Sequence, residues 1–270
     1  MKSLAACVLV LACSLFVAES ASAKDRGADG KFEKRTSSHF LLYQDVDIDR
    51  TSGFRGSRRF ENQVLETLES AYDSLDDALG LRPTRRIEVR IWDPGIFDRE
   101  FAGLFGFSAA GFYSGTIHIR GDTELRARLV RTLHHELVHA AWDVLAPSFV
   151  LPAWLNEGLA QWFEARGVGK HRISAAEAAA MAHFASQGLL DPLMDEGAVS
   201  FSHLDSEFAR IAYLRSYAFI EFLARRNGDD SLRRLCKTLV RKRNIDRAFS
   251  VTFGAKLDEL SRRFVGEYGS

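Results

Sequence analysis

The sequence predicts an α+β fold in which a small N-terminal sheet with one helix is followed by a mostly helical half. Residues 86–92 alternate charged and apolar side chains, and shorter apolar runs lie at 39–43, 111–113 and 116–120, which is typical of strands. Beyond residue 122, apolar residues recur at helical spacing. No linker rich in Pro, Gly or Ser separates the halves, so we expect them to pack as one unit.

The composition is that of a globular protein and excludes two broad classes. The 270 residues include 36 Lys and Arg against 36 Asp and Glu, and 46% are hydrophobic. This apolar content can fill a core, which excludes a disordered chain. Without excess positive charge to neutralise phosphates, a general nucleic-acid binder is also excluded, so we expect no nucleic-acid partner.

The N-terminus has the three parts of a secretory signal peptide. Lys2 supplies a positive charge, residues 4–18 are almost wholly apolar, and a small-x-small cleavage site lies at residues 21–23. The apolar run is shorter than the roughly 20 residues that span a bilayer. Residues 1–23 therefore predict export to the periplasm or secretion, without stable membrane insertion after cleavage. A lipoprotein attached through Cys13 is an alternative.

The mature chain divides into three segments. Residues 24–36 are polar and predict a flexible leader, residues 37–122 an N-terminal α/β subdomain with an edge strand, and residues 123–270 a helical subdomain that forms one unit with the preceding one. Cys236 is left alone after signal cleavage and is expected to be a buried structural thiol. Helices are expected at residues 60–79, 125–145, 153–165, 174–186, 208–226, 231–241 and 257–268.

A metal-binding motif lies within the helix expected at residues 125–145. The segment HELVH places His135 and His139 four residues apart, which is one face of a helix, with Glu136 next to the first histidine. This H-E-x-x-H pattern is typical of zinc sites in which the Glu is a general base. The plainer interpretation is a surface helix with two ordinary histidines.

Glu157 is the predicted third ligand. It lies 18 positions after His139, in the first turns of the next expected helix. An antiparallel helix pair with a short connection brings such a carboxylate over the two histidines. His135, His139 and Glu157 are therefore expected to hold a single Zn²⁺ per chain, with one coordination position left open for catalysis.

These motifs carry a family resemblance. HELVH at 135–139 and WLNEG at 154–158 resemble the gluzincin zinc metallopeptidases, which include the thermolysin and membrane alanyl aminopeptidase catalytic domains. The short chain and its export signal resemble the small bacterial peptidase MA-like family. The resemblance covers roughly residues 125–239 and implies a zincin catalytic fold.

The resemblance also suggests groups that contact the substrate. The segment that starts at Tyr213 resembles the aminopeptidase segment whose Tyr donates a hydrogen bond to the oxyanion, and Tyr217 is a weaker candidate. The layout of the family implies that the strand at residues 116–120 pairs with an extended substrate. His118 on that strand is then a substrate candidate or a plain surface histidine.

Two departures from the family pattern bear on the activity. Aminopeptidases bind the free amine of the substrate through a Glu, and the plausible counterpart at residues 111–115 has no carboxylate, which favours an endopeptidase. Thermolysin-like sites place an Asp four residues after the ligand Glu, where this chain has Gln161. Asp143, four residues after His139, is another candidate partner for an imidazole.

The sequence therefore predicts an exported zinc metallopeptidase acting on peptide or protein substrates. Zinc-activated water would attack the peptide bond, with Glu136 as general base and Tyr213 as oxyanion donor. Two alternatives stay open: a zinc-stabilised, non-catalytic binding protein on a peptidase fold, and an amidase that acts on cell-wall peptides.

Overall fold

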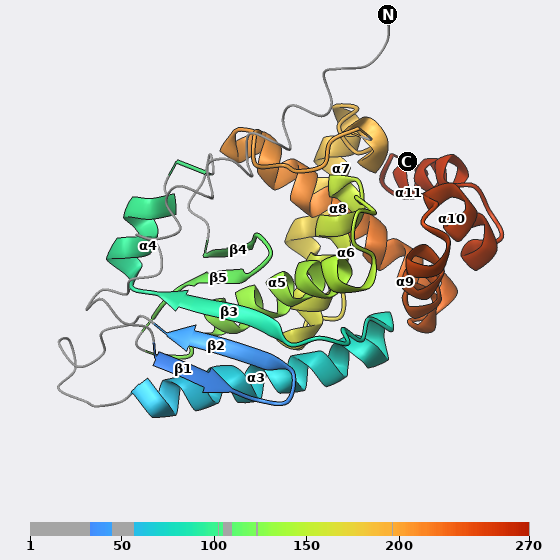
Figure 1. Cartoon of the computed structure of the whole chain (residues 1–270). Coiled ribbons are helices and arrows are strands. Elements are labelled where there is room, and N and C mark those ends of the chain that lie inside the picture. The colour runs from blue at the N-terminus through green and yellow to red at the C-terminus, as the bar shows by residue number, and fades with distance from the viewer. Residues whose placement is uncertain are drawn as a thin grey trace, which may run out of the picture.

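The computed structural model describes residues 33–44, 57–101, 103–104, 110–122, 124–195 and 197–269. The predicted signal peptide at residues 1–23 lies outside the described residues, as does most of the predicted leader. A small sheet lies at one side of the molecule and the later helices at the other (Figure 1). The described structure is therefore α+β, with the strands preceding most of the helices.

The sheet has five strands in the order β1-β2-β3-β5-β4. Strand β3 is parallel to its neighbours β2 and β5, whereas β1 and β4 are antiparallel additions at the two edges. Alternate residues of β3 are buried, as its alternating sequence predicts. The strands are β1 (Glu33–Thr36), β2 (Phe40–Gln44), β3 (Ile87–Trp92), β4 (Gly111–Tyr113) and β5 (Ile117–Arg120).

Two predictions about the strands were wrong. Glu33–Thr36 form β1 and pair with β2, so the last part of the predicted leader belongs to the sheet. The strand predicted to accept a substrate, β5, has β3 on one side and β4 on the other. Its backbone hydrogen-bonding groups are already used, and β4 is the edge strand instead.

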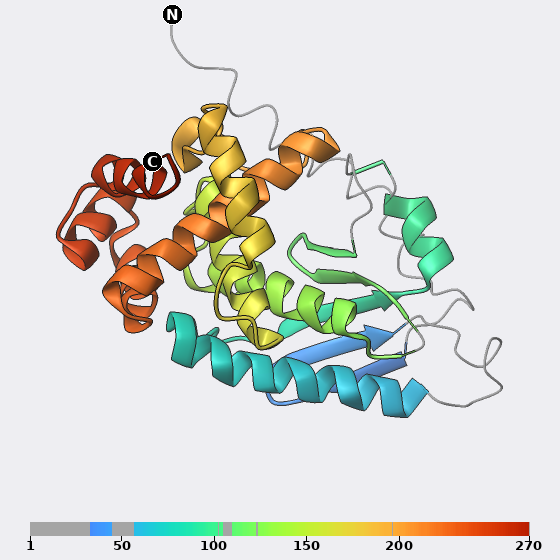
Figure 2. The same ribbon diagram turned by 180° about the vertical axis from the view of Figure 1, so that it is seen from behind.

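Helices α3 (Ser57–Leu79) and α5 (Ala127–Leu145) cover one face of the sheet, as the view from behind shows (Figure 2). Strand β4 lies very close to α5 because Gly111 has no side chain. A Cβ at Gly111 would lie 2.8 Å from Cγ2 of Thr132. Helix α4 (Pro94–Phe101), which the sequence did not predict, packs Phe97 and Phe101 against Trp92 on the opposite face.

The helical half is built around α6 (Ala153–Gly167), which packs between α5 and α8 (Ser206–Asn227). Helices α6 and α8 approach closely at Gly158, where a Cβ would lie 2.8 Å from the carbonyl oxygen of Ser216. The remaining elements are α7 (Ala175–Ser186), the short 3-10 helix η1 (Pro192–Asp195), α9 (Asp230–Lys242), α10 (Ile245–Phe253) and α11 (Leu257–Tyr268).

One continuous core extends from the sheet through to α11, so the two halves pack as a unit. Helix α10 was not among the helices predicted from the sequence, although Asn244 caps it by accepting a hydrogen bond from the backbone N–H of Arg247. Within the described ranges, none of the helices combines the length and apolar character required for a membrane span.

Candidate metal centre

Helix α5 places its two predicted ligands one turn apart on the side away from the core. Leu129, Leu133 and Leu137 bury the opposite stripe of the helix against the sheet and its neighbours. The rings of His135 and His139 have centroids 5.0 Å apart. The helical periodicity that buries the leucines therefore also aligns the imidazoles.

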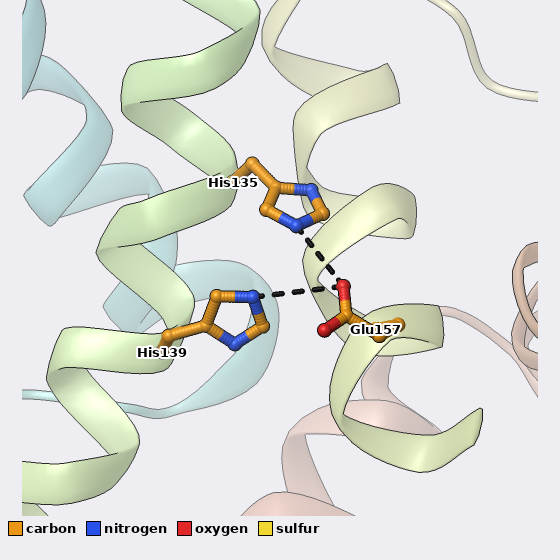
Figure 3. Close-up of side chains that lie close together, drawn as sticks. All are labelled: His135, His139 and Glu157. Carbon is orange, nitrogen blue, oxygen red and sulfur yellow. Dashed lines mark hydrogen bonds and ion pairs between the residues drawn. The ribbon is translucent and has the colours of Figure 1, made fainter. Parts of the chain in front are cut away.

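Helix α6 brings Glu157 back over these histidines. Oε2 of Glu157 lies 3.2 Å from Nε2 of His135 and 3.7 Å from Nε2 of His139. The three side chains point toward one another from the two helices (Figure 3). One ligand atom from each lies within 4.8 Å of the other two, so all three can reach a common divalent cation.

Hydrogen bonds to the other ring nitrogens orient both imidazoles. Nδ1 of His135 lies 3.0 Å from Oε2 of Glu164, and Nδ1 of His139 lies 3.0 Å from Oδ1 of Asn156. Each Nδ1–H can donate to its oxygen, which leaves the Nε2 lone pair directed at the cluster centre. Arg131 donates from Nε to the second oxygen of Glu164, 2.7 Å away, and so fixes that carboxylate.

The charges of the cluster also suit a cation. Burial opposes ionisation of Glu157, but His139 and His135 outweigh it and hold the pKa of the carboxyl well below its usual range. Burial likewise disfavours a charged His135, yet hydrogen bonds to Glu157 and Glu164 raise the pKa of its imidazole well above the usual value. The carboxylates thus hold protons on the rings, and a divalent cation can replace those protons.

Glu136 differs from Glu157 in its surroundings. Burial is the largest influence on it and raises the pKa of its carboxyl, although His135 and His139 act in the opposite direction. Its side chain lines the same cleft as the histidines. A carboxylate in these surroundings is a stronger base than an exposed one, which is what proton abstraction near neutral pH requires.

The cluster lies in a cleft of about 630 Å³ between β4 and the helical half. Tyr213 of α8 and Gln161 of α6 both line this cleft. Burial, with smaller contributions from Glu157 and Glu136, raises the pKa of the Tyr213 hydroxyl, which therefore stays protonated and able to donate.

The structure does not bring the other three candidates to the cluster. Asp143 accepts a hydrogen bond from the Tyr113 hydroxyl, 2.8 Å away, whereas Asn156 faces His139. Tyr217 lies outside the cleft, with Nζ of Lys170 4.9 Å from the centre of its ring.

His118 lies on the face of the sheet opposite α5. Its ring stacks on Phe112 at 4.8 Å, and its Nδ1 accepts a hydrogen bond from Nε1 of Trp92 at 3.1 Å. Successive side chains of β5 alternate between faces, and Ile117 and Ile119 occupy the face that packs on the core. His118 therefore belongs to an aromatic cluster behind the sheet.

Glu164 and Asn156 were not among the site residues predicted from the sequence. Glu164 lies seven residues after Glu157, which is about two helical turns and the same face. That spacing is a signal for a second carboxylate on this face, but the family resemblance pointed to Gln161 instead. Asn156 directly precedes the ligand Glu157, and its contact with His139 depends on how α5 and α6 pack.

A comparison with protein families agrees with this geometry. The model of the Peptidase MA superfamily matches residues 79–266, more than half of the chain, and the match includes His135, His139 and Glu157. No curated protein matches the chain. Members of this superfamily are typically metal-dependent peptidases, and the chain contains a His-His-Glu cluster able to bind a metal ion. The chain belongs to the Peptidase MA superfamily.

Proposed function

We propose that this protein is an exported, zinc-dependent endopeptidase. The observation that carries the proposal is the convergence of His135, His139 and Glu157, whose ligand atoms lie within 4.8 Å of one another beside the buried carboxylate of Glu136. Two imidazoles and one carboxylate are a donor set typical of catalytic zinc, with one position left for water or substrate.

Bound Zn²⁺ would polarise the substrate carbonyl and make a water molecule more acidic. Side chains of the protein accept and donate the protons that the reaction moves. The carboxylate of Glu136 accepts a proton from the attacking water and returns it to the nitrogen of the leaving amine. Tyr213 donates from its hydroxyl to the oxygen of the tetrahedral intermediate.

Strand β4 is the proposed backbone partner of the substrate, in place of β5. The carbonyl of Ala110 accepts a hydrogen bond from the backbone N–H of Arg120 in β5 at 2.9 Å, and the N–H of Ser114 donates to Thr116, directly before β5, at 3.0 Å. In an antiparallel pair, alternate residues point their backbone N–H and C=O groups toward the partner strand and the others point them away. The backbone groups of Gly111 and Tyr113 therefore face the open edge of the sheet. This edge borders the cleft and could pair with an extended peptide.

An endopeptidase is favoured over an aminopeptidase. The described residues of β4, Gly111–Tyr113, contribute no carboxylate that could bind a free amine. An open edge strand beside the cleft can instead pair with an internal segment of a peptide substrate, as an endopeptidase requires. The proposed export rests on the signal-like residues 1–23.

Zinc content and casein cleavage, measured together for the wild type and Glu136→Gln, test this function. We expect both proteins to retain zinc and only the wild type to cleave casein. A wild type that holds zinc but cleaves no peptide or protein would instead favour the binding protein. Release of fragments from peptidoglycan without casein cleavage would favour the cell-wall amidase.

A further inference from the structure

A second cavity of about 440 Å³ lies beside the catalytic cleft. Its walls come from the connection between α5 and α6, from residues 197–199 and from the starts of α10 and α11. Val199 lines both the cleft and this cavity, so the two share a wall. The volume lies within the range of sites that accept small ligands or side chains.

The cavity is close to the metal cluster. It includes Pro152, which directly precedes α6 and accepts a hydrogen bond from the backbone N–H of Asn156 at 3.1 Å. Pro152 and Glu157 are five residues apart, about 7.5 Å along a helix axis. An extended peptide advances about 3.3 Å per residue, so two or three residues cover this distance.

Most residues that line this cavity are apolar, and Arg243, Asn244 and Asp246 add polar groups to it. Val150 and Val199 at this cavity are 66% and 65% exposed, which is high for large apolar side chains. Phe149 and the buried side chains of Leu151 and Leu257 also line the cavity. Large exposed apolar side chains gathered at one cavity are typical of a binding site.

Trp154 adds an independent observation. It lines the cavity and is 0% exposed, yet its indole Nε1 has no hydrogen-bond partner among the residues that the structure describes. A buried donor without an acceptor is uncommon in folded proteins. A shift of this indole toward the cavity would let its N–H donate to the backbone carbonyl of a bound peptide.

We propose that this cavity is a subsite for an apolar side chain of the peptide substrate, two or three residues from the scissile bond. The proposal rests on the proposed function, because the same peptide must lie in the cleft. Such a subsite would select an extended peptide that carries a bulky apolar residue such as Leu at a fixed distance from the cleaved bond. The shared wall at Val199 is the argument for continuity between the two sites.

A binding experiment tests the subsite without depending on turnover. Zinc-loaded Glu136→Gln protein would be titrated with fluorescent dodecapeptides that carry one Leu at each position in turn, and with a dipeptide too short to reach the subsite. Val150→Asp should weaken binding of the best Leu-containing dodecapeptide by about tenfold or more, the effect expected for losing an apolar side-chain pocket. The dipeptide should bind equally with and without this change.

Val251→Asp is the matched control. Val251 is 63% exposed on α10 and lines neither cavity, so this change adds the same charge elsewhere. Thermal unfolding would check that both variants fold. Equal binding by the Val150 and Val251 variants would overturn the subsite, as would equal binding of dodecapeptides with and without Leu.

Two further outcomes are distinguishable. If Val150→Asp dissociates a dimer in sedimentation and leaves peptide binding unchanged, the cavity binds a second copy of the chain and the subsite proposal is wrong. If dodecapeptides bind in a Val150-dependent way but the wild type cleaves none of them, the subsite stands and the proposed peptidase function fails.

Discussion

Oε2 of Glu164 lies 3.0 Å from Nδ1 of His135, while the other oxygen of the same carboxylate accepts a hydrogen bond from Arg131. This carboxylate therefore fixes the ring orientation and tautomer of a candidate zinc ligand. The resemblance to thermolysin-like enzymes implied such a group four residues after Glu157, where this chain has Gln161. Here it comes from one turn further along α6.

Replacing Glu164 by Gln should weaken zinc binding by about 10- to 100-fold, the usual range for losing an oriented partner of a metal-bound imidazole. Competition with a chromophoric chelator measures the affinity. Gln161→Ala is the control and should leave the affinity unchanged. A larger loss of zinc affinity in the Gln161 variant than in the Glu164 variant would mean that Gln161, and not Glu164, orients His135.

Replacing Tyr213 by Phe should lower kcat by about 10²- to 10³-fold, the range for removing one oxyanion donor. Zinc content should not change. Tyr217→Phe serves as the control, because Tyr217 lies outside the cleft beside Lys170. Steady-state kinetics on one peptide substrate gives kcat for both variants. A large loss of kcat in the Tyr217 variant alone would assign the oxyanion-donor role to Tyr217.

Gly158→Ala should destabilise the fold by about 1–3 kcal/mol, because a Cβ there would lie 2.8 Å from the carbonyl oxygen of Ser216 and from Cγ1 of Ile220. The matched change is Gly266→Ala in α11, where a Cβ would meet nothing within 4 Å and where Ala favours the helix by up to about 1 kcal/mol. Chemical denaturation measures both. A neutral Gly158 variant would contradict the close packing of α6 on α8.

Burial raises the pKa of the Cys236 thiol to about 12, against 9.0 for an exposed thiol. Because the folded protein holds the proton more tightly, the stability from the buried neutral thiol is complete below pH about 9. That stability is lost as the pH rises toward about 12. The difference in unfolding free energy between the wild type and Cys236→Ala should therefore shrink over this interval.

A thiol-reactive dye provides a second measurement on Cys236. At pH about 8.5 the folded protein should react slowly and the denatured protein quickly, since the thiolate is the reactive form. Rapid labelling of the folded protein would show that the thiol is exposed or ionised, contrary to its position in the core.

The sequence predicted the long helices and the cluster of His135, His139 and Glu157 because both depend on local spacing. Leu129, Leu133 and Leu137 define the buried stripe of α5, and the same periodicity places His135 and His139 together. Glu157 was found because a short connection between adjacent helices favours antiparallel packing. Apolar periodicity and a short connection between helices are both local features, so a single sequence is enough to detect them.

The parts that were missed depend on tertiary packing. Which strand lies at the sheet edge is set by the pairing of β4 with β5, which no local pattern near His118 reveals. Asp143 was a reasonable partner for His139 by helical spacing, but Tyr113 reaches it across from β4. Helix α4 has only eight residues, too few for a helical pattern to stand out in the sequence, and its buried Phe97 and Phe101 pack onto aromatic side chains such as Trp92.

Zinc stoichiometry, measured by elemental analysis of the purified wild type and a His135→Ala variant, tests whether His135, His139 and Glu157 hold a catalytic zinc ion. We expect one zinc ion per wild-type chain, loss of that zinc in the variant, and cleavage that stops on chelation and returns when zinc is restored. A wild type that is free of zinc and indifferent to chelators, or a variant that keeps the same zinc content, would contradict the proposed zinc site.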